Sequence, residues 1–298
     1  MKVLVTGSKG QVGRELQNRG AEKGLTMIGV DIEEIDITDM RAVARLVEAS
    51  APDLVVNAAA YTAVDLAESN RKIAFQVNRD GPANIAAACA TAGVPLIHIS
   101  TDYVYGGDKE GAYTEDDPMA PLGVYAESKA AGDRQVADIL RAHVIVRTAW
   151  VYSVHGHNFV KTMLRLGRDR ERLTVVDDQE GCPTDAADLA AAILDIVGSF
   201  QREGDAPWGT YHYCGGGHTT WHGFASMVFE IAARYETFNV RSIQPVPTSA
   251  YPTPAKRPAN SVLDCSKIKA AFGIVPPPWE KSLAGMLDRL YRRKGVAE

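Results

Sequence analysis

The sequence is poor in cysteine and in net charge. Its four cysteines, Cys89, Cys182, Cys214 and Cys265, form no Cys-x-x-Cys pair. This argues against a disulfide framework or a thiolate zinc site and favours a reducing compartment. The formal net charge of -5 argues against nucleic acid or an anionic membrane as the main partner.

Long hydrophobic runs are also lacking. The apolar stretch before the first glycines, in MKVLVTGSKGQVG, is too short for a signal-peptide core, and no later run could span a bilayer. We therefore expect a cytoplasmic protein with no nucleic-acid or membrane partner. The histidines complete no ligand set of recognisable spacing with acids or cysteines, so we expect no metal site.

What the first half does contain is an alternation of short apolar segments with helical ones. The apolar segments are rich in β-branched residues and do not alternate with polar ones, as in strands buried on both faces. We expect strands at residues 3–5, 26–30, 53–56, 95–99 and 143–146, and helices at 11–23, 40–49, 70–92 and 120–141. This order predicts an α/β fold with a doubly wound parallel (Rossmann) sheet.

The pattern loosens after Trp150, where prolines gather in two clusters. We expect further helices at residues 158–168, 185–200, 221–233, 266–271 and 279–292. The predicted organisation is an NAD(P)-binding Rossmann domain over residues 1–150 and mainly a smaller substrate-binding lobe over 151–298. The boundary is soft, since elements after Trp150 can return to the first domain.

A glycine-rich loop, Thr6-Gly7-Ser8-Lys9-Gly10-Gln11-Val12-Gly13, follows the first strand and opens the first helix. Gly7 suits the tight turn, Gly10 lets the backbone approach a diphosphate, and Gly13 permits close helix–strand packing. The helix amino terminus then offers N–H groups to the phosphates. The spacing differs from the commonest G-x-G-x-x-G fingerprint, so a purely structural turn is the alternative.

An acid ends the second strand. Asp31 lies where a carboxylate can accept hydrogen bonds from the adenosine ribose, and it would repel a 2′-phosphate. The carboxylate therefore favours NADH over NADPH as coenzyme. Lys9 could offset the repulsion, so the coenzyme preference stays open. Asp36 and Ile37 are placed to border the adenine. The segment Asn57-Ala58-Ala59-Ala60 follows the third strand, and its small side chains would let the chain run beside the cofactor; a helix start is the alternative.

The segment Tyr125-Ala-Glu-Ser-Lys129 carries the expected chemistry. A spacing of four on a helix places the two side chains on one face. The ammonium should lower the tyrosine pKa so that the hydroxyl exchanges a proton nearer neutral pH. Thr101, at the end of the fourth strand, can hydrogen-bond the substrate oxygen that Tyr125 protonates.

A second Tyr-x-x-x-Lys pair, Tyr105 and Lys109, has the same spacing. Gly106 and Gly107 lie between its members and disfavour a helix, so the two side chains need not share a face. We therefore assign the chemistry to Tyr125 and Lys129.

The glycine loop, the strand-end Thr101 and the Tyr125/Lys129 pair together resemble the extended short-chain dehydrogenase/reductase superfamily. Finer motifs resemble its dTDP-4-dehydrorhamnose reductase family and extend over nearly the whole chain. They include Asn57-Ala-Ala-Ala-Tyr-Thr-Ala-Val-Asp65, Ser100-Thr-Asp-Tyr-Val104, Arg147-Thr-Ala-Trp-Val-Tyr152, Asp178-Gln-Glu-Gly-Cys-Pro-Thr184, Thr219-Thr-Trp-His222 and Arg257-Pro-Ala-Asn-Ser261.

This resemblance implies reduction of the C4 ketone of dTDP-6-deoxy-L-lyxo-4-hexulose (dTDP-4-dehydrorhamnose) to dTDP-L-rhamnose, with NADH or NADPH. By carry-over, Thr101, Tyr125 and Lys129 are catalytic, and Thr101, Asp102 and Trp150 contact the sugar. The residues implied to line the cofactor are Gly10, Gln11, Val12, Asp31, Asp36, Ile37, Ala60, Tyr61 and Thr62. We further infer Arg257 and Asn260 as partners of the nucleotide diphosphate.

The chain departs from the family pattern in a few places. Tyr105 stands where phenylalanine is common, and Tyr61 where histidine can occur. Some members bind magnesium at a dimer interface through carboxyl-terminal acids, but Asp288–Lys294 is mostly basic here. Neither the metal nor that dimer is carried over, and the oligomeric state, including a homodimer, stays open.

Two other functions compete with reduction. A nucleotide-sugar dehydratase or epimerase is the nearest, but dehydration commonly needs Thr-Asp-Glu after the fourth strand, whereas this chain has Thr101-Asp102-Tyr103. The other is a non-catalytic, nucleotide-binding regulatory subunit, which the intact Tyr125/Lys129 pair disfavours.

Overall fold

A computed structural model of the chain describes residues 1–200 and 207–295. Its centre is a six-stranded sheet, in which every neighbouring pair of strands is parallel. Across the sheet the strands are β10 (Gly209–His212), β5 (His143–Thr148), β4 (Leu96–Thr101), β3 (Leu54–Asn57), β1 (Lys2–Thr6) and β2 (Thr26–Val30). The predicted parallel α/β sheet is confirmed.

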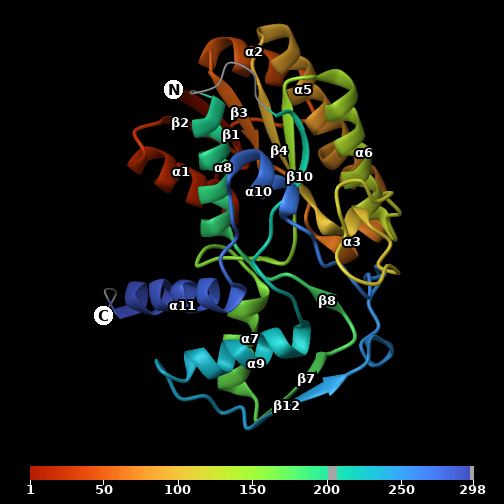
Figure 1. The fold of residues 1–298 in the computed structure, drawn as a ribbon, viewed down its shortest axis with the longest axis vertical. Helices are drawn as coiled ribbons and strands as arrows, with labels where there is room; N and C mark the ends of the chain where they lie inside the picture. Colours follow the sequence, from red (N-terminus) through yellow and green to blue (C-terminus); the bar gives the residue numbers. More distant parts are fainter. Residues whose placement is uncertain (201–206, 296–298) are drawn as a thin grey trace.

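Helices cover both faces of this sheet (Figure 1). One face bears α1 (Gln11–Glu22), α8 (Ala186–Phe200) and α10 (Ser266–Phe272); the other bears α2 (Met40–Ser50), α5 (Gly81–Ala92) and α6 (Val124–Ile139). Because successive strand residues point to opposite faces, Val3 and Val5 join the core beneath α8, whereas Leu4 joins the core beneath α5.

The second half of the chain contributes to this layer. β10 pairs with β5, and α8 packs against α1. The sequence predicted the α8 helix but not the β10 strand. We propose that β10, α8 and α10 belong with residues 1–150 in the cofactor domain.

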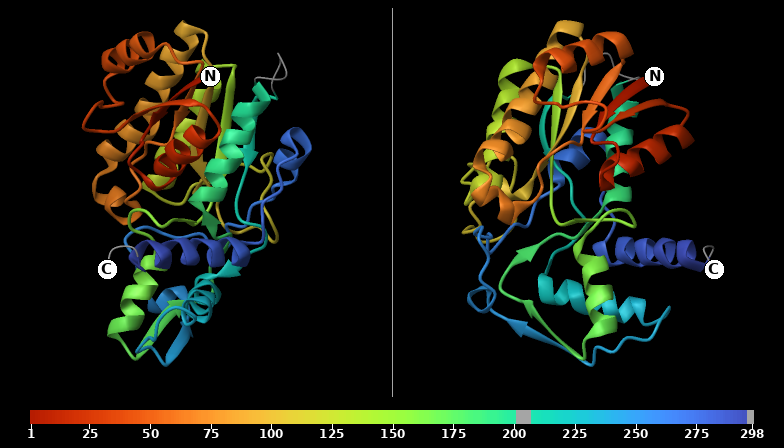
Figure 2. Two further views of the ribbon diagram at one scale, coloured as in Figure 1. Left: turned by 90° about the vertical axis from the view of Figure 1, so that its left-hand side faces the viewer. Right: turned by 180° about the vertical axis from the view of Figure 1, so that it is seen from behind.

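Most other elements of the second half form a smaller lobe, which lies below the carboxyl ends of the strands in both views of Figure 2. Its helices are α7 (Phe159–Asp169), α9 (Trp221–Ala232) and α11 (Trp279–Gly295), beside the parallel pair β7 (Arg172–Val176) and β12 (Ser242–Val246). They share a core that includes Phe224 and Leu283. The helices were predicted, but β7, β12 and the two-residue strands β6 (Val151–Tyr152), β8 (Glu180–Gly181), β9 (Thr184–Asp185) and β11 (Thr219–Thr220) were not.

Two predicted helices differ from those observed. The expected helix over residues 70–92 is divided into α4 (Arg71–Phe75), a π-helical turn η1 (Gln76–Asp80) and α5, preceded by the separate helix α3 (Val64–Ser69). The helix expected from residue 120 begins at Val124, after Pro121 and Gly123, and the Glu68 carboxylate accepts a hydrogen bond from the Val124 N–H.

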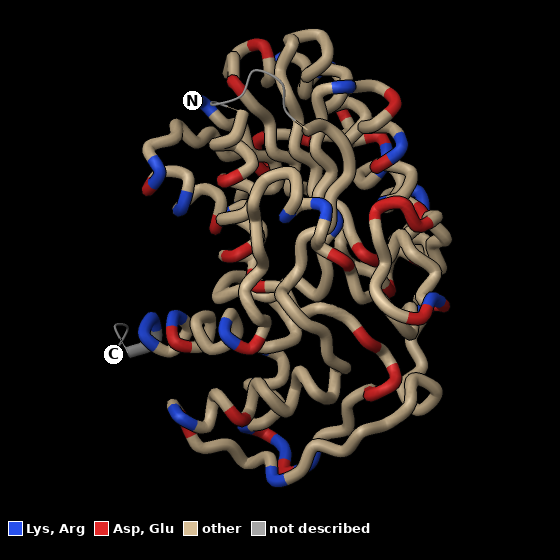
Figure 3. Tube along the Cα trace, viewed as in Figure 1, with Lys and Arg blue, Asp and Glu red and all other residues tan. Residues whose placement is uncertain are grey.

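The surface carries both signs of charge, and Lys and Arg are interspersed with Asp and Glu in the view of Figure 3. None of the helices in the described part of the chain has the length and apolar composition that a membrane-spanning helix requires. The four cysteines are free thiols, although Cys214 Sγ lies 3.6 Å from Cys265 Sγ.

Candidate active site

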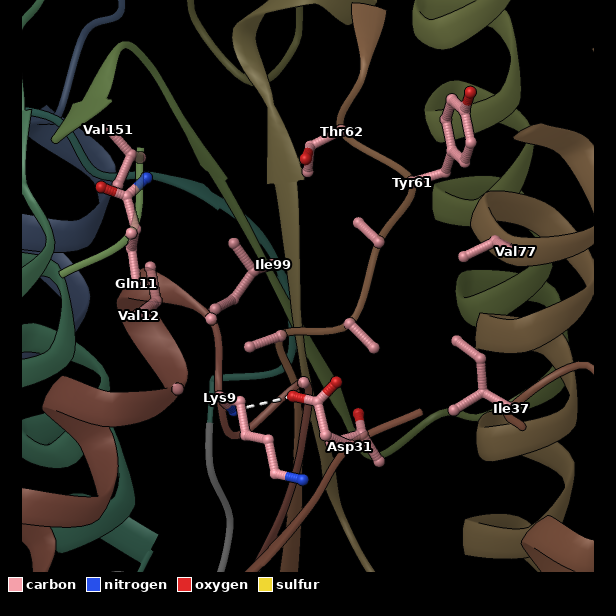
Figure 4. Close-up of a pocket in the computed structure, with 18 of the residues that line it drawn as sticks. Lys9, Gln11, Val12, Asp31, Ile37, Tyr61, Thr62, Val77, Ile99 and Val151 are labelled. Atoms are coloured by element: carbon pink, nitrogen blue, oxygen red, sulfur yellow. Dashed lines mark hydrogen bonds between the residues drawn. The ribbon is translucent and has the colours of Figure 1, made fainter. Parts of the chain in front are cut away.

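A cavity of about 690 Å³ opens at the carboxyl ends of β1, β3 and β4, the edge where open α/β sheets bind ligands. Figure 4 shows part of its lining: the glycine loop, the end of β2 and the segment after β3. It brings together all predicted cofactor and catalytic residues and three of the predicted substrate residues, namely Gly7, Gly10, Gln11, Val12, Gly13, Asp31, Asp36, Ile37, Ala60, Tyr61, Thr62, Thr101, Asp102, Tyr125, Lys129 and Trp150.

The glycine loop forms a cradle that side chains would fill. Gly7 has φ of +71°, and a Cβ there would lie 2.6 Å from the Ala59 nitrogen. A Cβ on Gly13 would lie 2.2 Å from the Gly7 carbonyl oxygen. The helix α1 begins after Gly10 without a side-chain cap, so its first N–H groups can serve a bound anion. This geometry fits a dinucleotide diphosphate.

Asp31 is fixed at the cavity wall beside this loop. One carboxylate oxygen accepts a hydrogen bond of 2.7 Å from the Lys9 N–H, drawn in Figure 4, and the other accepts one of 2.9 Å from the Ile32 N–H. The Lys9 ammonium pairs instead with Glu33 and Glu34, at 3.0 and 2.8 Å. The charge that could have offset repulsion of a 2′-phosphate is thus shared with two acids.

The segment after β3 is held from behind by Asn78, which lies in the π-helical turn and is fully buried. Its side chain accepts a hydrogen bond from the Tyr61 N–H and donates to the Tyr61 carbonyl and to Ser128 of α6. A π-helical turn inside a helix often marks a functional site. Here it links the cofactor wall to the helix of Tyr125 and Lys129, a role that no sequence signal revealed.

Tyr125 lies on the first turn of α6, directly over the end of β4. Its hydroxyl is within hydrogen-bonding reach of the Thr101 side chain, and its ring meets that of Tyr103 edge to face, with centroids 6.1 Å apart. Thr101 in turn donates a hydrogen bond of 2.9 Å to the Asp102 carboxylate. The structure therefore joins the predicted acid and the strand-end hydroxyl.

The pKa of Tyr125 is raised in the structure, whereas the sequence predicted that it would be lowered. Burial raises the pKa of Tyr125 to about 12, and the hydrogen bond with Thr101 opposes this only partly. The Lys129 ammonium donates a hydrogen bond of 2.8 Å to the Ile99 carbonyl oxygen. Tyr125 is consequently a protonated phenol at neutral pH, as a proton donor must be.

Lys129 is itself withdrawn from water, with only 2 % of its surface exposed. Burial lowers its pKa to about 8, and the Asp133 carboxylate acts in the opposite direction. Its ammonium remains at the cavity wall, where it can donate to the hydroxyls of a nicotinamide ribose. Asp102 is also buried, which raises its pKa to about 6.

Trp150 forms the wall of the cavity nearest the smaller lobe. It has φ of +44°, a strained conformation for a bulky residue. Its ring stacks on Trp221 with an interplanar angle of 8°, and Gly181 leaves room for it, since a Cβ there would lie 2.4 Å from the indole. The strain is consistent with a ring held for contact with a ligand.

Arg257 and Asn260 do not line this cavity. The Arg257 guanidinium pairs with Asp65 at 2.9 Å. The Asn260 amide donates hydrogen bonds of 2.7 Å to the carbonyls of Lys109 and Gly111. The nucleotide-diphosphate role predicted for these two residues has no support from the cavity itself.

The second Tyr-x-x-x-Lys pair, Tyr105 and Lys109, does not line the cavity. The Tyr105 hydroxyl lies 2.7 Å from both Arg147 and His212, and Lys109 pairs with Asp117 at 2.6 Å. These contacts give both residues structural roles and support the choice of Tyr125 and Lys129.

Comparison with known proteins agrees with this geometry. The RmlD substrate binding domain family matches residues 1–292. A dTDP-4-dehydrorhamnose reductase from Sinorhizobium fredii is 43 % identical over 285 residues, which cover 95 % of this chain and 95 % of the relative.

Two solved structures are similar over almost their whole length. The dTDP-4-dehydrorhamnose reductase of Clostridium acetobutylicum superposes with a TM-score of 0.91 at 37 % identity, covering 97 % of this chain and 99 % of that one. The Bacillus anthracis enzyme, solved in complex with NADP, gives a TM-score of 0.90 at 35 % identity, with the same coverage.

Proposed function

The chain belongs to the family of the RmlD substrate binding domain, that of the dTDP-4-dehydrorhamnose reductases, and we propose that it reduces the C4 ketone of dTDP-4-dehydrorhamnose with Tyr125 as proton donor. The product is dTDP-L-rhamnose, and the coenzyme is NADH or NADPH. The observation that carries this proposal is that Tyr125, Thr101 and Lys129 line the same cavity as the glycine cradle.

The protein's part in the reduction is to orient the ketone and supply a proton. When bound, the reduced nicotinamide supplies the hydride. The Thr101 hydroxyl and the Tyr125 phenol converge on the position of the ketone oxygen, and Tyr125 gives its proton to that oxygen as negative charge develops on it. The Lys129 ammonium stabilises the resulting phenolate and holds the nicotinamide ribose.

The sugar would lie between these groups and the smaller lobe. Trp150 offers an apolar face, and Asp102 an acceptor for a sugar hydroxyl. Thr101, Asp102 and Trp150 thus remain our proposed sugar contacts. A role in the positioning of the substrate also accounts for the conformational strain at Trp150.

Net consumption of coenzyme separates reduction from its rivals. With dTDP-4-dehydrorhamnose, the purified chain should oxidise NADH or NADPH in proportion to the dTDP-L-rhamnose formed. An epimerase would interconvert nucleotide sugars without net coenzyme oxidation, and a regulatory subunit would bind without turnover. Either outcome would contradict the proposal.

Asp31 gives the first prediction. Asp31→Asn should raise kcat/KM with NADPH relative to NADH by about tenfold, because it removes a carboxylate that would repel a 2′-phosphate. The ratio is measured by initial rates with each coenzyme at saturating ketosugar. Glu48→Gln, which removes an exposed acid from α2, is the control and should leave the ratio unchanged. An unchanged ratio in Asp31→Asn would place the ribose elsewhere.

The second prediction concerns Arg257. We propose that the nucleotide diphosphate draws its guanidinium away from Asp65, while Asn260 braces the same loop through the carbonyls of Lys109 and Gly111. Arg257→Gln should raise the KM for the nucleotide sugar by about tenfold or more, because a charge-assisted pair with phosphate is lost. Coenzyme affinity, measured by fluorescence titration, should stay within about twofold of wild type. A lowered coenzyme affinity with unchanged KM would refute the assignment.

A further inference from the structure

A row of buried polar side chains crosses three strands of the sheet, on the face covered by α6. Thr6 on β1, Asn57 on β3 and His98 on β4 are neighbours in register, and each is at most 3 % exposed. The Thr6 hydroxyl donates a hydrogen bond of 2.7 Å to the Asn57 carbonyl oxygen, and the Asn57 nitrogen lies 3.0 Å from His98 Nδ1. The row starts at the cavity, which Thr6 lines.

These contacts determine which nitrogen of His98 carries the proton. The Asn57 side-chain oxygen accepts from Thr6 and from the Ala59 N–H, so its amide nitrogen donates to His98 Nδ1. Burial lowers the pKa of His98 well below its usual value, so the ring is neutral and its proton is on Nε2. That N–H faces Lys129 Nζ at 3.5 Å and Asp133 Oδ1 at 3.8 Å.

Asp133 lies one helical turn after Lys129, on the same face of α6. It is 2 % exposed, and its Oδ2 accepts a hydrogen bond of 3.1 Å from Arg147 Nε on β5. Among the described residues its Oδ1 has no hydrogen-bond partner. Arg147 is anchored in turn by Tyr105, at 2.7 Å.

Stability alone does not account for this pair. Withdrawing two charges from water costs about as much as their attraction returns, and apolar replacement of a whole buried pair is often neutral or stabilising. The unpartnered Oδ1 adds a further cost. The pair does, however, place a negative charge beside Lys129, where it offsets the desolvation of the ammonium.

We propose that Asp133 is a positioning residue for the reduction. It is held by Arg147 and faces His98, and its carboxylate keeps Lys129 charged and fixed against β4. The proposal rests on the function proposed above, because it assumes that the Lys129 ammonium serves the reaction. It makes α6 a single device, with the proton donor, the cation and the charge that maintains the cation on successive turns.

The other ionisable groups around Lys129 leave Asp133 as its nearby negative charge. His98 on β4 lies 3.5 Å from its Nζ. On β5, His143 acts on His98 and Arg147 pairs with Asp133, while Asp102 acts on Tyr125 at the start of α6. On the outer helices, Glu68 receives the Val124 N–H, Arg71 pairs with Glu127, and Arg79 pairs with Asp80.

Asp133→Asn tests the proposal, with the Lys129 ammonium observed directly. In protein labelled with ¹⁵N-lysine and free of coenzyme, the Lys129 side-chain resonance is identified by its loss in Lys129→Met. Its titration midpoint should fall by about one pH unit or more in Asp133→Asn. Asp138→Asn makes the same change at an exposed site on α6 and should leave the midpoint unchanged.

Turnover should follow this shift. Activity that requires the ammonium is lost as the pH rises through its pKa, so a lower pKa moves the alkaline limb of the kcat profile to lower pH by the same amount. Asp133→Glu, which restores the charge, should recover part of the shift. If Asp133→Asn does not fold because Arg147 is left unpaired, Asp133→Leu combined with Arg147→Met removes the whole pair and should still lower the midpoint.

Three results would separate the possibilities. A lower unfolding temperature with an unmoved Lys129 midpoint would make Asp133 purely structural and overturn the proposal. An equal shift in Asp138→Asn would also overturn it. A shifted midpoint in a chain that reduces no ketosugar would support the link between Asp133 and Lys129 while refuting the proposed function.

Discussion

Replacing Tyr125 with phenylalanine is expected to lower kcat by at least about a hundredfold, because general acid catalysis typically contributes this much or more. The change removes one oxygen and leaves the ring that packs against Tyr103. Coenzyme affinity should therefore stay within a few-fold of wild type. Steady-state kinetics with the ketosugar and a fluorescence titration with the coenzyme measure the two effects separately.

Tyr103→Phe is the matched control, since it removes the same oxygen from the neighbouring ring. It should retain most of the activity, because Tyr103 is not placed to reach the ketone. Full activity in Tyr125→Phe would eliminate Tyr125 as the proton donor. Equal losses in the two variants would instead indicate a general disturbance of the site.

Loss of Lys129 should impair both binding and turnover. The Lys129→Ala variant lacks the ammonium that holds the nicotinamide ribose and stabilises the Tyr125 phenolate. Because the contact with the ribose is lost, the coenzyme Kd should rise about tenfold or more. In addition, kcat should fall about a hundredfold, because the phenolate is no longer stabilised. Single-turnover rates at saturating coenzyme separate the second effect from the first.

The alanine variant also leaves a hole beneath α6, so Lys129→Met is needed beside it. Methionine keeps the length of the buried chain without its charge. Both variants should show the same functional losses if the charge matters, whereas only alanine should strongly lower the unfolding temperature. Recovery of activity in Lys129→Met would show that the lysine acts through packing alone.

The parallel sheet could be predicted because its strands are buried on both faces and lie between clear helical segments. β10 could not, since Gly209–His212 gains its strand character only by pairing with β5. The short strands of the smaller lobe escaped prediction for the same reason. Their pairings depend on contacts between distant segments rather than on local propensity.

The cavity was largely predictable because the glycine loop, the strand-end hydroxyl and the Tyr/Lys pair can each be recognised from a local sequence pattern. The pKa shift of Tyr125 was not predictable, because its direction depends on how deeply the ring is buried and on where the Lys129 ammonium points. His98 did leave a signal, as a polar residue inside the apolar segment of β4. Asp133 left none, since an acid on a helix is ordinarily exposed.

Transfer of a label would test the proposed reduction most directly. The purified chain is supplied with dTDP-4-dehydrorhamnose and a coenzyme deuterated at its transferring position, and the product is analysed by NMR and mass spectrometry. Reduction as proposed predicts dTDP-L-rhamnose with a single deuterium at C4 and one coenzyme oxidised for each product formed. Unlabelled product, or a rearranged nucleotide sugar without net oxidation of coenzyme, would contradict it.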